Sequence, residues 1–175
     1  TGEVVLVHKA DIEYTVGIIT VSSSRFKKYG ALRGIESLGD FDESGMEIYS
    51  AFKDVVKDYA LVSDDIEMIR CALFEVLKNT DVCIITGGTG LSPSDVTVEA
   101  VKPLFTKEIE GFGEIFRMLS YQEIGSSALL SRATAGLIKD KIVFCLPGSK
   151  KAVKLAVNII KPAIGHMLVH ARGLA

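Results

Sequence analysis

Short apolar runs separated by helical patterns constrain the fold of this chain more than any other feature of its sequence. The runs are Thr15–Ser22, Asp81–Thr86 and Lys141–Leu146. Almost continuous apolar character is typical of strands in a parallel sheet, because helices cover both faces of such a sheet. We therefore predict an α/β fold, a three-layer αβα sandwich with a largely parallel central sheet, formed by one domain that spans residues 1–175.

Helical periodicity predicts the elements in the first half of the chain. In the segment 41–60, one face of a predicted helix carries Met46, Tyr49, Phe52, Val56 and Tyr59. Residues 42–44, which precede this helical pattern, are candidate N-caps. The segment 63–80 repeats the pattern, with Ser63 or Asp64 as its N-cap. We expect Ala60–Val62 to be a short strand. Because Ser22–Asp40 shows no sustained period, it is predicted to be a long surface loop.

The second half continues the alternation of strands and helices. Helices are predicted from about Asp95 to just before Pro103, over Gly111–Gly125, and over residues 149–173 with a break at Pro162. Residues 133–138 and 141–146 are two strands joined by a tight connection. They predict an antiparallel hairpin at the edge of the sheet.

Composition excludes several classes of partner. The formal net charge is -2, so no global basic field draws nucleic acid or an anionic membrane to the chain. The three cysteines lie far apart in apolar stretches, which suits buried thiols in a reducing compartment. No apolar segment reaches the roughly 18 residues needed to cross a bilayer, and no signal-peptide pattern precedes the first strand. We expect a cytoplasmic protein.

The glycine-rich sequence TGGTG, which follows the strand Asp81–Thr86, predicts an anion site. In a parallel sheet, ligands bind beyond the carboxyl ends of the strands, where this loop should meet Ser22–Arg25 and Pro147–Lys151. Glycines let backbone N–H groups approach a phosphate closely. The spacing matches neither the dinucleotide fingerprint nor the P-loop, and a plain strand-to-helix turn is the alternative.

Two aspartates near this loop predict a cation. Asp64, Asp65 and Asp95 are candidate helix caps. Asp64 and Asp95 are alternatively ligands of Mg²⁺, which binds through one or two carboxylates together with substrate phosphates. His166 and His170 lie four residues apart without a visible third ligand, so packing or surface roles are favoured over a metal site. Cys145 lies in a strand pattern without a partner that would activate it as a nucleophile.

At this point the sequence resembles the MoaB/MogA molybdopterin adenylyltransferases. Four segments occur in the same order as in that family, and the resemblance covers nearly the whole chain from Thr15 onward. They are TGGTGLSPSDVTVEA, EGFGEIFR, SALLSRATAG and LPGSKKAV. The resemblance implies that Mg·ATP and molybdopterin react to give adenylyl-molybdopterin and pyrophosphate. It also implies a trimer or hexamer, with hand-off of the product to a molybdenum-insertion enzyme.

The resemblance also implies roles for individual residues. Asp64 and Asp95 are the catalytic aspartates and the Mg²⁺ ligands. Nucleotide phosphate is bound by Gly87, Gly88, Thr89 and Gly90. Molybdopterin is bound by Ser22, Ser131, Gly148 and Ser149, and Ser120 is a weaker match on that side.

The chain departs from the family pattern at three positions. Ser23 stands where the family usually has aspartate, Ser63 where it commonly has proline, and Cys145 where molybdopterin-binding relatives have asparagine. Two other functions therefore stay open. They are a non-catalytic molybdopterin-binding or assembly module, and a relative that processes pyridine nucleotides.

Overall fold

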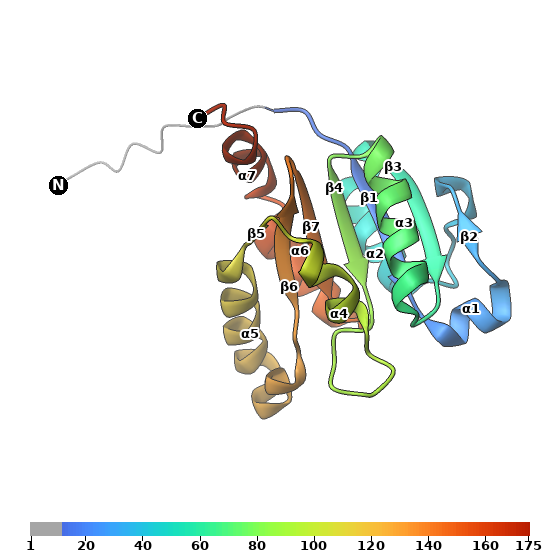
Figure 1. Ribbon diagram of the computed structural model, residues 1–175. Helices are drawn as coiled ribbons and strands as arrows, with labels where there is room; N and C mark the ends of the chain where they lie inside the picture. The colour runs from blue at the N-terminus through green and yellow to red at the C-terminus, as the bar shows by residue number, and fades with distance from the viewer. Residues whose placement is uncertain (1–11) are drawn as a thin grey trace.

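A seven-stranded sheet between two layers of helices forms the part of the chain that the computed structural model describes, residues 12–175 (Figure 1). The strands are β1 (Val16–Val21), β2 (Leu32–Arg33), β3 (Val56–Val62), β4 (Val82–Thr86), β5 (Lys107–Glu108), β6 (Thr134–Ile138) and β7 (Lys141–Leu146). The α-helices are α1 (Ser23–Tyr29), α2 (Glu43–Phe52), α3 (Ile66–Asn79), α4 (Thr97–Val101), α5 (Glu110–Ile124), α6 (Lys150–Ile160) and α7 (Ile164–Ala171). Short 3₁₀ turns are η1 (Ile35–Ser37), η2 (Lys53–Val55), η3 (Lys102–Leu104) and η4 (Gly125–Leu130).

The sheet has the order β2-β3-β1-β4-β7-β6-β5. Its four central strands β3, β1, β4 and β7 are parallel, and β2, β6 and β5 run antiparallel to their neighbours. This arrangement confirms the predicted α/β sandwich. The predicted hairpin is β6–β7, but the two-residue strand β5 pairs with β6 and forms the outer edge instead.

Alternate residues of the central strands face two separate hydrophobic cores. The face of the sheet that carries Ile18 packs against α2, α5, α6 and α7. The face that carries Ile19 packs against α3 and α4. Because both faces are covered, β1 and β4 are buried along their whole length. This double burial explains the continuous apolar runs in the sequence.

The prediction of a loop over Ser22–Asp40 was wrong. The segment contains α1, β2 and η1, and the hydroxyl of Ser22 caps α1 by accepting from the Arg25 N–H. No residue of α1 is buried, so the helix leaves no apolar period in the sequence. Its formation depends on its cap and its neighbours instead.

The predicted stripe from Met46 to Tyr59 was also wrong in its second half. Helix α2 ends at Phe52, because Lys53 adopts a φ of 35° that an α-helix cannot continue through. Val56 and Tyr59 belong to β3, which begins four residues before the predicted strand and pairs with β1. Pairing in the sheet therefore overrides the helical spacing of these residues.

Other boundaries were predicted within a few residues. Helix α5 matches its predicted range closely, and the C-terminal helix breaks beside Pro162 into α6 and α7, which meet at 60°. Across residues 12–175 no single helix is long and apolar enough to cross a bilayer; only the bent pair α6 and α7 reaches that length and composition. Of the cysteines, Cys83 and Cys145 are buried as expected, but Cys71 is exposed on α3.

A buried tyrosine and aspartate join α2 to the sheet. The Tyr59 hydroxyl donates to Asp42 Oδ2 at 2.7 Å, while Asp42 Oδ1 caps α2 by accepting from Gly45 N–H at 3.0 Å. Both side chains are fully buried. Burial, with the neighbouring Asp42, raises the pKa of the Tyr59 hydroxyl, so it remains a proton donor. Asp42 thereby holds the start of α2 against β3.

Replacing Tyr59→Phe should lower the free energy of unfolding by about 1–3 kcal/mol, because one oxygen of Asp42 would stay buried without its donor. Urea denaturation of the two proteins measures this difference. The matched control is Tyr29→Phe, whose side chain is exposed on α1 and which should change stability by less than about 0.5 kcal/mol. Equal stability of Tyr59→Phe and the unmodified chain would contradict the assignment.

Candidate functional site

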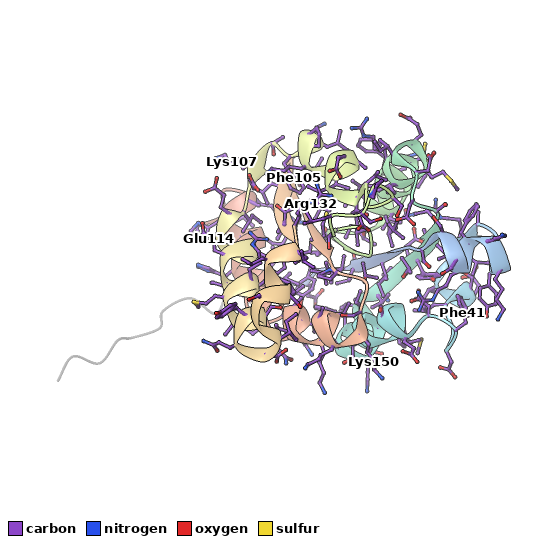
Figure 2. The ribbon with its side chains drawn as sticks, turned by 90° about the horizontal axis from the view of Figure 1, so that it is seen from below. Phe41, Phe105, Lys107, Glu114, Arg132 and Lys150 are labelled. Carbon is purple, nitrogen blue, oxygen red and sulfur yellow. The ribbon has the colours of Figure 1, made fainter. Side chains whose placement is uncertain are left out.

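The candidate site is a cleft of about 580 Å³ at the carboxyl ends of β1, β4 and β7. In Figure 1 this end of the sheet lies at the bottom, where α1, the loop after β4 and η4 gather, and Figure 2 views the molecule from that side. Ten of the eleven residues that were predicted for the site line it, and Ser120, the weaker match, does not. The ten are Ser22, Asp64, Gly87, Gly88, Thr89, Gly90, Asp95, Ser131, Gly148 and Ser149.

The glycine loop, Gly87–Gly90, is held by hydrogen bonds to its carbonyl groups. Thr97, at the start of α4, donates from its hydroxyl to Gly87 O at 2.7 Å and from its N–H to Gly88 O at 3.0 Å. Thr97 is fully buried, so both bonds are shielded from water. The first half of the loop is therefore fixed onto α4.

Arg132 holds the second half of the glycine loop. Its backbone N–H donates to Thr89 O at 2.9 Å, its Nε to Gly90 O at 3.0 Å, and its Nη2 to Asp95 O at 3.2 Å. Figure 2 shows Arg132 beside the loop, near the middle of the view. The guanidinium also pairs with Glu99 of α4, and hydrogen bonding to it lowers the pKa of the Glu99 carboxyl.

These contacts leave the loop amides for a ligand. Within residues 12–175, Gly87 N–H donates to Leu146 O at 2.9 Å, but the N–H groups of Gly88, Thr89 and Gly90 have no protein acceptor. Gly87 and Gly88 adopt φ values of 103° and 72°, which L side chains rarely allow. Adjacent free amides in such a turn can form a concave site for an anion, the kind of site that TGGTG predicts.

Asp64 lies beside Gly88 because Asp65, not Ser63 or Asp64, caps α3. Asp65, one of the three candidate caps, accepts from Met68 N–H at 2.9 Å and leaves Asp64 to the cleft. Oδ2 of Asp64 accepts from the Ser23 hydroxyl at 2.6 Å. Oδ1 faces the loop, since a methyl group built on Gly88 would lie 3.4 Å from it.

Asp95 lies on the other side of the glycine loop. It does not cap α4, which begins at Thr97 after Val96 without a side-chain cap. Instead, Oδ2 of Asp95 accepts from Ser92 N–H at 3.0 Å and lies 2.7 Å from a methyl group built on Gly90. The two aspartates therefore flank the free amides.

The donor set of the cleft fits Mg²⁺ that arrives with phosphate, rather than a resident metal. No cluster of three or more His, Cys, Asp or Glu side chains capable of holding a metal occurs in the described part of the chain. Two carboxylates beside an anion site are the partial set that Mg²⁺ uses when substrate phosphates complete its shell. Asp64 and Asp95 are the residues that would hold it.

The third strand end supplies the opposite wall of the cleft. Ser149 caps α6 as predicted, accepting from Ala152 N–H at 3.2 Å, and Gly148 O accepts from the Ser44 hydroxyl at 2.5 Å. Ser131 lies next to Arg132, so its position is tied to the glycine loop. Ser120 is buried in α5 and does not line the cleft.

Ser23, Ser24 and Arg25 line the cleft, as predicted for the segment Ser22–Arg25. Sequence reasoning missed two contributors: Leu130, which lines the cleft, and Arg132, which holds the glycine loop. The SRATAG segment contains Arg132, but only the structure shows which carbonyls it contacts. Burial raises the pKa of the Cys145 thiol to about 12, which agrees with the absence of a nucleophilic role.

Known proteins are similar to this chain over most of its length. The family described as probable molybdopterin binding domain matches residues 17–166. A probable molybdopterin adenylyltransferase from Methanocaldococcus jannaschii is 40% identical over 167 residues, covering 94% of this chain and 98% of its own length. Molybdenum cofactor biosynthesis protein B from Staphylococcus epidermidis is 46% identical over 161 residues, 87% of this chain and 86% of that protein.

Solved structures show the same fold. The crystal structure of the tungsten cofactor synthesizing protein MoaB from Pyrococcus furiosus has a TM-score of 0.77 and 41% sequence identity, covering 91% of this chain and 97% of that one. A crystal structure of molybdenum cofactor biosynthesis protein B has a TM-score of 0.78 and 40% identity, covering 92% and 97%. Similarity therefore extends over nearly the whole length of both chains.

Replacing Arg132→Gln should weaken the binding of pyrophosphate in the presence of Mg²⁺ about 10-fold, because the carbonyl groups of Gly90 and Asp95 would lose the guanidinium that holds this end of the loop. Isothermal titration calorimetry measures the affinity. The matched control is Arg70→Gln, since Arg70 Nε likewise donates to a carbonyl of α4, Ala100 O at 2.8 Å, but lies outside the cleft. Unchanged affinity in folded Arg132→Gln would contradict this role.

Proposed function

The chain belongs to the family of probable molybdopterin binding domains, and on that premise we propose that it adenylylates molybdopterin with Mg·ATP, giving adenylyl-molybdopterin and pyrophosphate. The relative named as a probable molybdopterin adenylyltransferase supports this activity. A role in molybdenum cofactor biosynthesis follows from the names of the curated relatives.

One observation carries the proposal: three unpaired loop amides lie between two carboxylates in a single cleft. Amides alone suit any anion, and carboxylates alone would repel one. Together they suit a phosphate chain that carries a divalent cation, which is the form in which ATP takes part in nucleotidyl transfer.

In this mechanism the protein acts by positioning. The N–H groups of Gly88, Thr89 and Gly90 donate to phosphate oxygens of the nucleotide. These hydrogen bonds place the α-phosphorus next to molybdopterin, the second substrate. Asp64 and Asp95 would hold Mg²⁺, which neutralises phosphate charge when bound. An oxygen of the molybdopterin phosphate then attacks the α-phosphorus, the bond to the β-phosphate oxygen breaks, and pyrophosphate leaves.

The wall formed by the other strand ends is assigned to molybdopterin. Ser22, Ser131 and Ser149 present hydroxyl groups there. Gly148 has no side chain to fill the space beside Gly87, where an added methyl group would lie 3.4 Å from Gly87 Cα. Hydroxyls that accept cap bonds can still donate to a phosphate. Because the product is an activated pterin, hand-off to a molybdenum-insertion enzyme is the expected next step.

Asp64→Asn and Asp95→Asn should each lower kcat about 100-fold or more, because each substitution removes a carboxylate that would hold the Mg²⁺ needed to neutralise the transferred phosphate. Release of pyrophosphate from molybdopterin, ATP and Mg²⁺ measures the rate. The matched control is Asp65→Asn, which lies next to Asp64 but caps α3, and asparagine caps a helix about as well as aspartate.

The same assay separates the two alternatives. A non-catalytic module would bind molybdopterin without releasing pyrophosphate from ATP. A relative that processes pyridine nucleotides would be protected against thermal unfolding by those nucleotides rather than by an adenylylated pterin. Either result would replace the adenylyltransferase proposal.

We also propose that the chain forms a homo-oligomer, a trimer or hexamer, through α5 and η4. Most of the large apolar side chains exposed in the described residues gather there. They are Ile115, Met118, Tyr121, Ile124, Leu129 and Leu130. A contiguous exposed apolar surface of this kind marks a protein interface. Leu130 also lines the cleft, so a second copy would lie close to the site.

Met118→Glu should convert the oligomer to smaller species, because it places a charge in the proposed apolar interface. Sedimentation velocity measures the change. The matched control is Phe74→Glu, since Phe74 is similarly exposed but lies on α3. An unmodified chain that sediments as a monomer, or an assembly that Met118→Glu leaves intact, would refute this interface.

A further inference from the structure

We propose that Ser23 is a positioning residue that holds the Asp64 carboxylate in one orientation, and that Ser63 supports it. The hydroxyl oxygens of Ser23, which lines the cleft, and Ser63 lie 2.9 Å apart. The inference rests on the proposed function for what Asp64 does in the reaction. The orientation of Asp64 can be tested separately.

The Ser23 hydroxyl uses its full hydrogen-bonding capacity. A serine hydroxyl has one proton to donate and two lone pairs that accept. Its oxygen lies 2.6 Å from Asp64 Oδ2, 3.1 Å from Asp64 N and 2.9 Å from the Ser63 hydroxyl oxygen. An ionised carboxylate accepts only and an amide donates only. The proton of Ser23 is therefore directed to Asp64, and Ser63 must donate to Ser23.

Two donors from the same residue converge on one carboxylate oxygen. Besides the hydroxyl, the backbone N–H of Ser23 donates to Asp64 Oδ2 at 3.2 Å. This N–H lies at the start of α1, where helical amides have no partner within the helix. Asp64 satisfies it, and the backbone of Asp64 in turn donates to Ser23 Oγ. The two residues thus form a closed, reciprocal pair across 41 positions of sequence.

The pair determines which oxygen of Asp64 faces the ligand. Because both donors of Ser23 engage Oδ2, rotation of the carboxylate would break two hydrogen bonds, one of them short and charge-assisted. Oδ1 is left toward Gly88, at the free amides of the glycine loop. Ser23 thereby keeps a single carboxylate oxygen directed at the position proposed for the phosphate and its cation.

Ser63 completes the arrangement from the other side. Its hydroxyl occupies the second lone pair of Ser23, which favours the rotamer in which the Ser23 proton points to Asp64. A residue at position 63 without a donor would leave that rotamer less strongly defined. The serine at position 63 therefore contributes to the same orientation without touching the carboxylate itself.

The first test is crystallographic and does not depend on catalysis. In Ser23→Ala, Asp64 should occupy more than one side-chain orientation, whereas Ser23→Thr, which keeps the hydroxyl, should restore the single orientation. The matched control is Ser24→Ala, because Ser24 also lies on α1 and lines the cleft, but its hydroxyl lies 3.3 Å from that of Ser22. An Asp64 that keeps one orientation in Ser23→Ala overturns the proposal.

The second test is a double-mutant cycle on Mn²⁺·ATP binding, followed by electron paramagnetic resonance of Mn²⁺. Ser23→Ala should weaken binding about 5- to 10-fold and Ser63→Ala about 2- to 3-fold, the effect of losing one or two modest hydrogen bonds. In an Asp64→Asn background, Ser23→Ala should cost nothing further, since Ser23 acts through Asp64.

The outcomes distinguish this proposal from the proposed function. Independent losses that multiply in the double variant would overturn the role of Ser23. If Asp64→Asn leaves Mn²⁺·ATP binding unchanged, the assignment of Asp64 to the cation fails, and the crystallographic result alone decides whether Ser23 orients the carboxylate. Rescue by Ser23→Thr in both tests supports positioning over a general loss of structure.

Discussion

The site depends on the hydrogen bonds that occupy the carbonyl groups of the glycine loop. A peptide group presents either its N–H or its carbonyl to one side of the chain, so tying the carbonyls to the protein turns the amides toward the cleft. Thr97 and Arg132 do this for four successive residues. Without these contacts the same glycines would be free to turn either way, and no anion site would be defined.

The parallel sheet explains why three separate segments could be predicted to meet. Strands β1, β4 and β7 run in one direction, so the segments that follow them reach one end of the molecule. This step needs only the prediction that these strands are parallel, which their continuous apolar character indicates. For the same reason, the positions of Ser22, Gly87 and Ser149 in the cleft were predictable, although their roles with substrates remain proposals.

Other parts of the fold and site left no local signal. Helix α1 buries no residue, so periodicity could not reveal it, and Val56 joined a strand despite its helical spacing because β1 was available to pair with it. Arg132 and Ser23 act on groups 42 and 41 positions away in sequence. Contacts of this range depend on the folded backbone, and a serine or arginine in an exposed segment has many other uses. The sequence offered Ser63, Asp64 and Asp65 as caps of α3, and the choice of Asp65, which only the structure shows, leaves Asp64 to the cleft.

The charges in the cleft argue that anion binding here needs a cation. Among the residues that line it, Asp64 and Asp95 are acidic and Arg25 is basic, whereas Arg132 is paired with Glu99. A phosphate charge about 4 Å from one carboxylate is repelled by about 4 kcal/mol at an effective dielectric constant near 20. Each amide hydrogen bond contributes only about 0.5–1.5 kcal/mol net. Three amides therefore do not offset the repulsion from two carboxylates. A divalent cation held between the carboxylates and the phosphate replaces this repulsion with a net attraction. Retention of both aspartates beside the glycine loop consequently favours a nucleotide that enters with its metal over a bare anion.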